Sequence, residues 1–228
     1  MPIISLILQM NIVVGDSRCR GLAALVPDVE FVVRPGGSFS DFLDPTIEVL
    51  DRIGASVPER PHLVYILCGV LDMVSREWGE WDAETIVPNS LYFPRIVESI
   101  DALGGAVRSR GAVPVFATIT PMNIAIYNEG RMKRGFTKQL EHQQEYPAMH
   151  RNHLMMIDRI NTYILEYNFR NIRATPLLHV QIRHSPRGKN GRYVYRWHYL
   201  SDGLHLTHHL LIKWARCLKI AISKNSRY

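Results

Sequence analysis

The sequence has 228 residues, of which 46% are apolar and 21% are charged, with a formal net charge of +6. This length is typical of one α/β domain, and the composition excludes an intrinsically disordered chain. The apolar fraction is sufficient for a core that needs no disulfide or metal, so we expect a single domain over residues 1–228.

The first half of the chain alternates apolar strands with polar turns. Segment 2–8 is short and apolar, without the basic region or cleavage site of a signal peptide, so we expect it to form or lead into a first strand. Apolar and β-branched runs predict strands at 12–14, 31–33 and 63–68, and glycine-containing turns follow them. The spacing of apolar residues predicts a helix over 45–53.

The second half continues the alternation of strands and helices. Residues 123–145 are polar, and their pattern predicts no element. Strands that alternate with helices indicate a parallel sheet covered on both faces, with its chemistry at the carboxyl ends of the strands. The predicted elements are a helix over 94–110, a strand over 113–119, a helix over 148–168, a strand over 177–182 and a helix over 207–223.

Three polar residues have the types and positions that nucleophilic catalysis requires. Ser17 ends the turn Gly15-Asp16-Ser17 after a predicted strand, which would expose its hydroxyl at the sheet edge. Asp202 and His205 lie three residues apart near the other end of the chain, so the carboxylate can reach one imidazole nitrogen while the other faces a serine. Each piece alone is more often a turn, a helix cap or a packed histidine, but the three together, at strand ends and in this order, favour catalysis.

Four sequence blocks resemble those of the SGNH (GDSL-type) hydrolases and occur in the order typical of that family. They are Val13-Val14-Gly15-Asp16-Ser17, Arg34-Pro35-Gly36-Gly37-Ser38, Leu67-Cys68-Gly69-Val70-Leu71-Asp72 and Asp202-Gly203-Leu204-His205, which resemble blocks I, II, III and V. Together they span nearly the whole chain. The resemblance implies a flavodoxin-like fold, a three-layer α/β/α sandwich with a central parallel sheet.

The resemblance also implies roles for individual residues. Ser17 would be the nucleophile and His205 the general base, with Asp202 orienting the histidine. The backbone N–H groups of Ser17 and Gly36 would form two arms of the oxyanion hole. The implied reaction is hydrolysis or transfer of an acyl group of a small ester or acylated substrate through an acyl-serine, with no metal or organic cofactor.

Block III departs from the family at one position, because Leu71 stands where the family has asparagine. Leucine cannot donate the third hydrogen bond to the oxyanion, and loss of one such donor lowers rates by about 10²–10³. We therefore expect reduced activity. Asn123, after the strand over 113–119, is a candidate replacement donor, and Leu71, Asp72 and Asn123 are candidate pocket residues.

A basic and aromatic segment over 183–199 suggests a different function. Arg187, Lys189 and Arg192 are candidates for nucleic-acid binding, because cations contact phosphates and rings stack on bases. The alternative hypothesis is therefore a catalytically impaired SGNH-like domain for binding or assembly, since domains of this fold also occur in proteins of mobile genetic elements. A solvated loop is an equally simple interpretation of the segment. A third possibility is an interaction module in which Gly-Asp-Ser is only a cap.

The remaining sequence features predict no metal site, disulfide or membrane span. His205 and His209 would share a helix face, as in zinc sites, but no glutamate lies between them and no third ligand is suitably spaced. The cysteines Cys19, Cys68 and Cys217 are odd in number and far apart, so we expect a reducing, cytoplasmic environment. No apolar run approaches the ~18 residues of a membrane helix.

Overall fold

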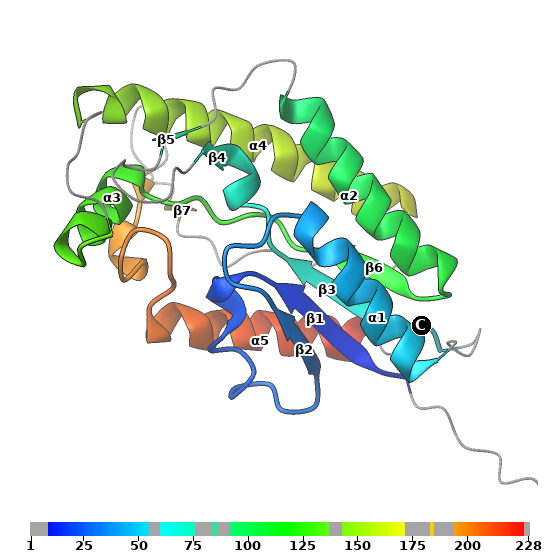
Figure 1. Ribbon diagram of the computed structural model, residues 1–228. Coiled ribbons are helices and arrows are strands. Elements are labelled where there is room, and N and C mark those ends of the chain that lie inside the picture. Colours follow the sequence, from blue (N-terminus) through cyan, green and yellow to red (C-terminus); the bar gives the residue numbers. More distant parts are fainter. Residues whose placement is uncertain are drawn as a thin grey trace, which may run out of the picture.

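The centre of the molecule is a sheet of four parallel strands in the order β2-β1-β3-β6 (Figure 1). The computed structural model describes residues 9–54, 60–75, 84–85, 92–136, 143–171, 183–184 and 194–225. The strands are β1 (Asn11–Gly15), β2 (Glu30–Val33), β3 (Leu63–Leu67) and β6 (Val113–Phe116). The chain moves outward from β1 to β2 and then returns to β3, so a topological switch point lies between β1 and β3.

Helices cover both faces of this sheet. On one face lie α1 (Leu43–Ile53), α2 (Tyr92–Ser109) and α4 (Tyr146–Asn171), and on the other lies α5 (His208–Asn225) (Figure 1). Helix α3 (Ile124–Lys133) follows β6. The short elements are η1 Ser17–Cys19, η2 Ser40–Phe42, η3 Leu71–Met73, η4 Gln143–Glu145, η5 Trp197–Tyr199, and the paired strands β4 Val74–Ser75 with β5 Glu84–Thr85 and β7 Arg183–His184 with β8 Val194–Tyr195.

Alternating side chains of the central strands supply two separate hydrophobic cores. Ile12, Val14 and Ile66 belong to the core under α1, α2 and α4. Val13 and Tyr65 belong to the core under α5. Successive side chains of a strand point to opposite faces, so a strand that is buried on both faces is apolar throughout. This explains why the strands appear in the sequence as continuous apolar runs.

The structure confirms the predicted strands at 12–14, 31–33 and 63–68 and the four predicted helices outside 123–145. Helix α3 was not predicted. The predicted strand 113–119 is three residues too long, because Asn161 of α4 takes over the backbone groups of Ile119. Its Oδ1 accepts from Ile119 N at 2.6 Å, and its Nδ2 donates to Ile119 O at 3.0 Å. Segments 2–8 and 177–182 lie outside the described residues.

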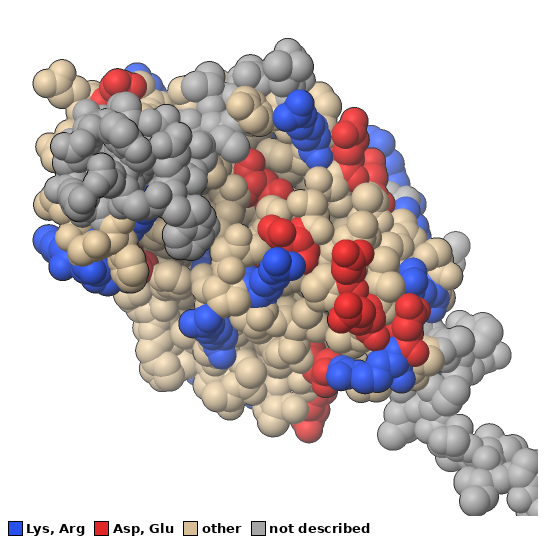
Figure 2. Space-filling model, in the orientation of Figure 1, with Lys and Arg blue, Asp and Glu red and all other residues tan. Residues whose placement is uncertain are grey.

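Charged side chains of both signs are interspersed on the face that α1 and α2 cover (Figure 2). Exposed pairs contribute to this pattern, such as Arg110 with Asp51. The net positive charge of the chain is therefore not gathered on this face. Within the described residues, no helix has the length and apolar character needed to cross a membrane.

Candidate functional site

The turn after β1 presents Ser17 at the carboxyl edge of the sheet. Gly15 permits this turn, because a Cβ atom there would lie 2.9 Å from the Leu67 carbonyl oxygen and would collide with the Cys19 thiol. Asp16 then begins η1, with its carboxylate accepting a hydrogen bond from Arg18 N at 3.0 Å. The interpretation of Gly-Asp-Ser as a cap is therefore correct for Asp16.

A buried ion pair holds the two residues that flank Ser17. The Arg18 guanidinium donates to both carboxylate oxygens of Asp16, with Nη2 at 2.8 Å from Oδ2, and both side chains are only 2% exposed. Arg18 Nη1 also donates to Thr120 O at 2.9 Å, which joins the turn to the segment after β6. Because the neighbours of Ser17 are held in this way, the backbone of Ser17 and the direction of its Cα–Cβ bond are held as well.

The structure brings Ser17, His205 and Asp202 together, as the sequence predicted. Ser17 Oγ lies 2.9 Å from His205 Nε2, and His205 Nδ1 lies 2.9 Å from Asp202 Oδ2. Asp202 Oδ1 accepts from the backbone N–H groups of Leu204 at 3.2 Å and His205 at 2.8 Å. This chain of contacts allows His205 to accept the Ser17 proton while Asp202 fixes the ring.

The carboxyl group of Asp202 is held in its ionised form. Burial acts to raise its pKa, but hydrogen bonds from the His205 ring and backbone and from Leu204 N outweigh burial. The pKa of Asp202 therefore lies well below its usual range. A carboxylate that is ionised over the ordinary pH range can stabilise an imidazolium at His205.

Helix α3 supports the loop that carries Asp202 and His205. Asn123 N donates to Gly203 O at 2.7 Å. Gly203 has a φ of +81°, and a Cβ atom there would lie 2.6 Å from both Asn123 O and Tyr127 N. Only glycine combines this backbone conformation with so close an approach. The sequence offered no signal for this contact, because the polar pattern of 123–145 predicted no helix.

The expectation that His205 and His209 share a helix face, as zinc ligands would, is wrong. Helix α5 begins at His208, so His205 lies in the preceding loop and does not share a helix face with His209. His209 instead packs near the ring of Tyr199. The described part of the chain contains no group of three His, Cys, Asp or Glu side chains that could hold a metal ion.

The predicted oxyanion-hole glycine lies in a tight turn. Gly36 has a φ of +74°, and Gly37 N donates to Arg34 O at 3.2 Å across it. Among the described residues, the backbone N–H groups of Ser17 and Gly36 have no hydrogen-bond acceptor. The role of these two groups as arms of an oxyanion hole stays a prediction.

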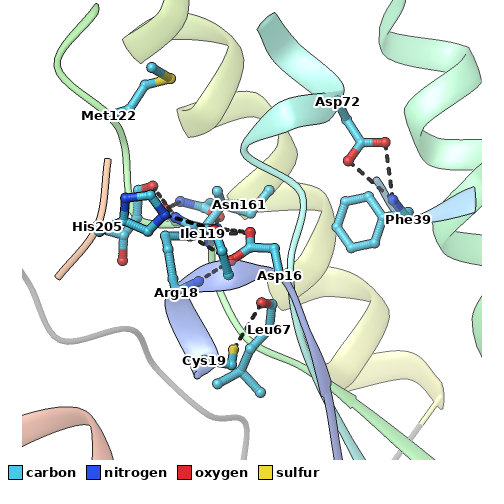
Figure 3. Close-up of polar contacts among 12 residues, drawn as sticks. Asp16, Arg18, Cys19, Phe39, Leu67, Asp72, Ile119, Met122, Asn161 and His205 are labelled. Carbon is cyan, nitrogen blue, oxygen red and sulfur yellow. Dashed lines mark hydrogen bonds and ion pairs between the residues drawn. The ribbon is translucent and has the colours of Figure 1, made fainter. Parts of the chain in front are cut away.

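Asp72 connects block III to the loop that follows Gly36. Its carboxylate oxygens accept from Phe39 N at 3.2 and 3.3 Å (Figure 3). Burial raises the pKa of Asp72 to about 7, while the hydrogen bond from Phe39 acts in the opposite direction. Asp72 therefore supports the backbone of the block II loop.

The other candidate pocket residues have mixed outcomes. Leu71 begins η3 and packs, partly buried, against the core under α1, α2 and α4. Asn123 caps α3, with its Oδ1 accepting from Ile126 N at 3.0 Å, and its role as an oxyanion donor stays a prediction. Arg187, Lys189 and Arg192 lie outside the described residues.

Solved structures with low sequence identity share this fold. A GDSL-like lipase from Bacteroides thetaiotaomicron superposes with a TM-score of 0.61 at 16% identity, over 95% of this chain and 88% of the lipase. A candidate acylhydrolase from Bacteroides fragilis gives 0.60 at 15% identity, over 96% and 88%. The OSK domain of Drosophila Oskar gives 0.51 at 11% identity, over 92% and 86%.

At these identities the similarity establishes the fold, and an assignment of catalysis has to come from the site itself. No protein-family model matches the sequence, and no curated protein matches it. The matched structures cover nearly the whole chain, and the parallel sheet has helices on both faces as the four sequence blocks implied. The chain therefore has the fold of the SGNH, or GDSL-type, hydrolases.

Proposed function

We propose that this protein is a serine esterase or acyl hydrolase that acts through a Ser17–His205–Asp202 triad. The observation that carries the proposal is the 2.9 Å contact between Ser17 Oγ and His205 Nε2, which joins residues 188 positions apart in the sequence. A chance turn and a chance histidine would not be expected to meet with an ionised carboxylate on the far ring nitrogen.

The proposed reaction has two steps. Ser17 Oγ attacks the carbonyl carbon of an ester while His205 takes the hydroxyl proton, and the backbone N–H groups of Ser17 and Gly36 stabilise the oxyanion. His205 then gives the proton to the leaving alcohol, and an acyl-serine remains. Water, deprotonated by His205, attacks the acyl-serine, and His205 returns the proton to Ser17 Oγ as the acid leaves. Asp202 stays ionised and stabilises the imidazolium in both steps.

The nucleophile can be tested by covalent labelling. We expect a fluorophosphonate probe to label the intact protein at Ser17 and p-nitrophenyl acetate to be turned over, because the probe reacts with a serine whose proton is taken by a base. Ser17→Ala and His205→Ala should abolish both signals. Ser109→Ala, a change of a serine on α2 away from the triad, should retain them. Mass spectrometry of the labelled peptide identifies the modified residue.

The proposal fails if the folded wild-type protein is not labelled, or if the label persists in Ser17→Ala. Absence of labelling together with salt-dependent binding of a single-stranded RNA would instead favour the impaired, nucleic-acid-binding domain. In that case, replacement of Arg187, Lys189 and Arg192 by alanine should weaken the binding.

We further propose that activity is reduced because Leu71 provides no hydrogen-bond donor. Leu71→Asn places an amide at the position of the family's third donor, so we expect kcat for p-nitrophenyl acetate to rise by on the order of 10². Leu71→Ala is the matched control, since it removes the same packing without adding a donor. Equal rates for Leu71→Asn and wild type would contradict this part of the proposal.

A further inference from the structure

Arg134 contacts the same carboxylate oxygen of Asp202 that faces His205. Its Nη1 lies 3.2 Å from Asp202 Oδ2, and His205 Nδ1 lies 2.9 Å from that oxygen. The arginine side chain is 46% exposed and the aspartate side chain 17% exposed. Asp202 Oδ2 is therefore shared between an imidazole and a guanidinium at the edge of the site.

The position of Arg134 is defined by the end of α3. Its backbone N–H closes the helix on Gly130 O and Arg131 O, each at 3.2 Å. Its Nε donates to Gly130 O at 3.0 Å, and its guanidinium carbon lies 5.6 Å from the centre of the Phe136 ring. A side chain with these contacts loses little further freedom when it also binds Asp202, and a cation at a helix C-terminus is favourable in itself.

Both ends of α3 thus hold one loop. The first end holds the loop by backbone contact between Asn123 and Gly203, and the last end holds it by the charge of Arg134 on Asp202. Two backbone N–H groups already orient Asp202 through Oδ1. These two bonds act on Oδ1, so what Arg134 adds is a contact and a positive charge at Oδ2, the oxygen that His205 uses.

We propose that Arg134 is a positioning residue of the triad, which binds Asp202 and places a positive charge beside the oxygen that His205 uses. This inference rests on the proposed function only for its kinetic consequence. A cation that shares the acceptor of an imidazolium repels that imidazolium, so we expect removal of the charge at position 134 to favour the protonated histidine over the neutral form that accepts the Ser17 proton.

The experiment compares pH–rate profiles of wild type, Arg134→Gln and Arg134→Lys. Glutamine keeps a hydrogen-bond donor without the charge, so we expect the acidic limb of kcat/KM to move to higher pH by about 0.5 pH unit. Arg134→Lys keeps the charge and should follow wild type. The displacement should shrink between about 20 mM and about 0.5 M salt, because the pair is half-exposed and ions screen it.

Two further arms isolate the effect of the charge at position 134. Arg52→Gln removes one positive charge from α1, where Arg52 pairs with Glu30, and should leave the acidic limb of the pH–rate profile at the pH of wild type.

NMR titration of the His205 ring in the Ser17→Ala protein measures the effect of Arg134→Gln on the histidine without turnover, so it remains informative if the proposed hydrolase activity fails. The inference is overturned if, at low salt, His205 titrates identically in Ser17→Ala and in the double variant that combines Ser17→Ala with Arg134→Gln. Equal displacement of the limb by Arg134→Gln and Arg134→Lys would overturn it as well.

The other charged or titratable groups near this loop are unchanged in these comparisons. The neighbouring elements carry Asp16 and Arg18 in the turn after β1, Glu129, Arg131 and Lys133 on α3, Arg196 and His198 at η5, and His208, His209 and Lys213 on α5. Because every variant keeps these groups, a displaced limb reports the charge at position 134 alone.

Discussion

The carboxyl group of Asp72 is partly buried, and its ionisation is opposed by its surroundings. Burial is the largest cause that raises its pKa from 3.8 to about 7, and the nearby carboxylates Asp41 and Asp16 act in the same direction. Between these two pKa values the unfolded chain has released the proton and the folded chain has kept it. Stability therefore falls as pH rises through this window, by on the order of 1.4 kcal/mol per pH unit.

Asp72→Asn should remove this loss of stability. The asparagine Oδ1 can still accept from Phe39 N, while no charge has to be desolvated. We expect the variant and wild type to differ little near pH 4, and the variant to gain a few kcal/mol relative to wild type by about pH 8. Urea unfolding of both proteins at several pH values measures the difference.

Asp41→Asn provides a control of opposite sign. Hydrogen bonds from the Ser38 hydroxyl and backbone lower the pKa of Asp41. The stabilising contribution of Asp41 itself is present above pH 3.8 and is lost only as pH falls below that value. Because the Asp41 charge also raises the pKa of Asp72, the effect of Asp41→Asn should vary between about pH 5 and about pH 8 only by the small part of the Asp72 shift that this charge causes. A constant effect of Asp72→Asn over the same range would show that Asp72 is ionised in the folded protein throughout.

At the scale of elements, prediction from sequence succeeded where one physical signal dominated. The strands over 12–14 and 63–68 are buried on both faces, which requires continuous apolar residues. Helix α1 has a strongly one-sided apolar pattern, and it was predicted within two residues at its start. Such patterns are local, so they are visible without the tertiary structure.

Helix α3 was missed because its residues carry no such pattern. Ile124 and Tyr127 are buried while Ile126 and Met132 are exposed, so apolar residues lie on several sides of the helix. Its start is set by the Asn123 cap, and its position by Gly203 and Arg134, which are contacts with a loop about 70 residues away. A helix defined by tertiary contacts gives little periodicity to detect.

The candidate site likewise contains residues that local sequence patterns predicted and residues that depend on tertiary contacts. Ser17, Asp202 and His205 were predictable because their order and local spacing match a known set of blocks, and the structure places them in contact. The supporting residues Arg18 and Arg134 were not predicted. Their contacts depend on how the turn after β1 and the end of α3 approach other segments, and no local spacing encodes those approaches.

At the scale of the whole molecule, the central sheet couples the two cores. The same strands supply Ile12 and Val14 to one core and Val13 to the other, so neither helical layer can leave without exposing the strands beneath it. The contact between Ser17 Oγ and His205 Nε2 also joins the turn after β1 to the loop before α5. We propose on these grounds that residues 1–228 fold as one cooperative unit, as the chain length suggested.

A matched pair of substitutions on α5 tests this unit. Leu218 is fully buried in the core under α5, and Ile220, two residues later, is 55% exposed. Leu218→Ala should lower the free energy of unfolding by about 2–5 kcal/mol, and Ile220→Ala should change it by less than ~0.5 kcal/mol.

In a cooperative unit, Leu218→Ala also lowers the urea midpoint at which α1, α2 and α4 unfold, by the same amount as for α5, although these helices cover the opposite face. Urea unfolding followed by far-ultraviolet circular dichroism, by tryptophan fluorescence and by labelling of Ser17 should then give one midpoint for each protein. An early loss of labelling and fluorescence in Leu218→Ala, with most of the helical signal retained, would show that the α5 layer unfolds separately and that the chain contains more than one folding unit.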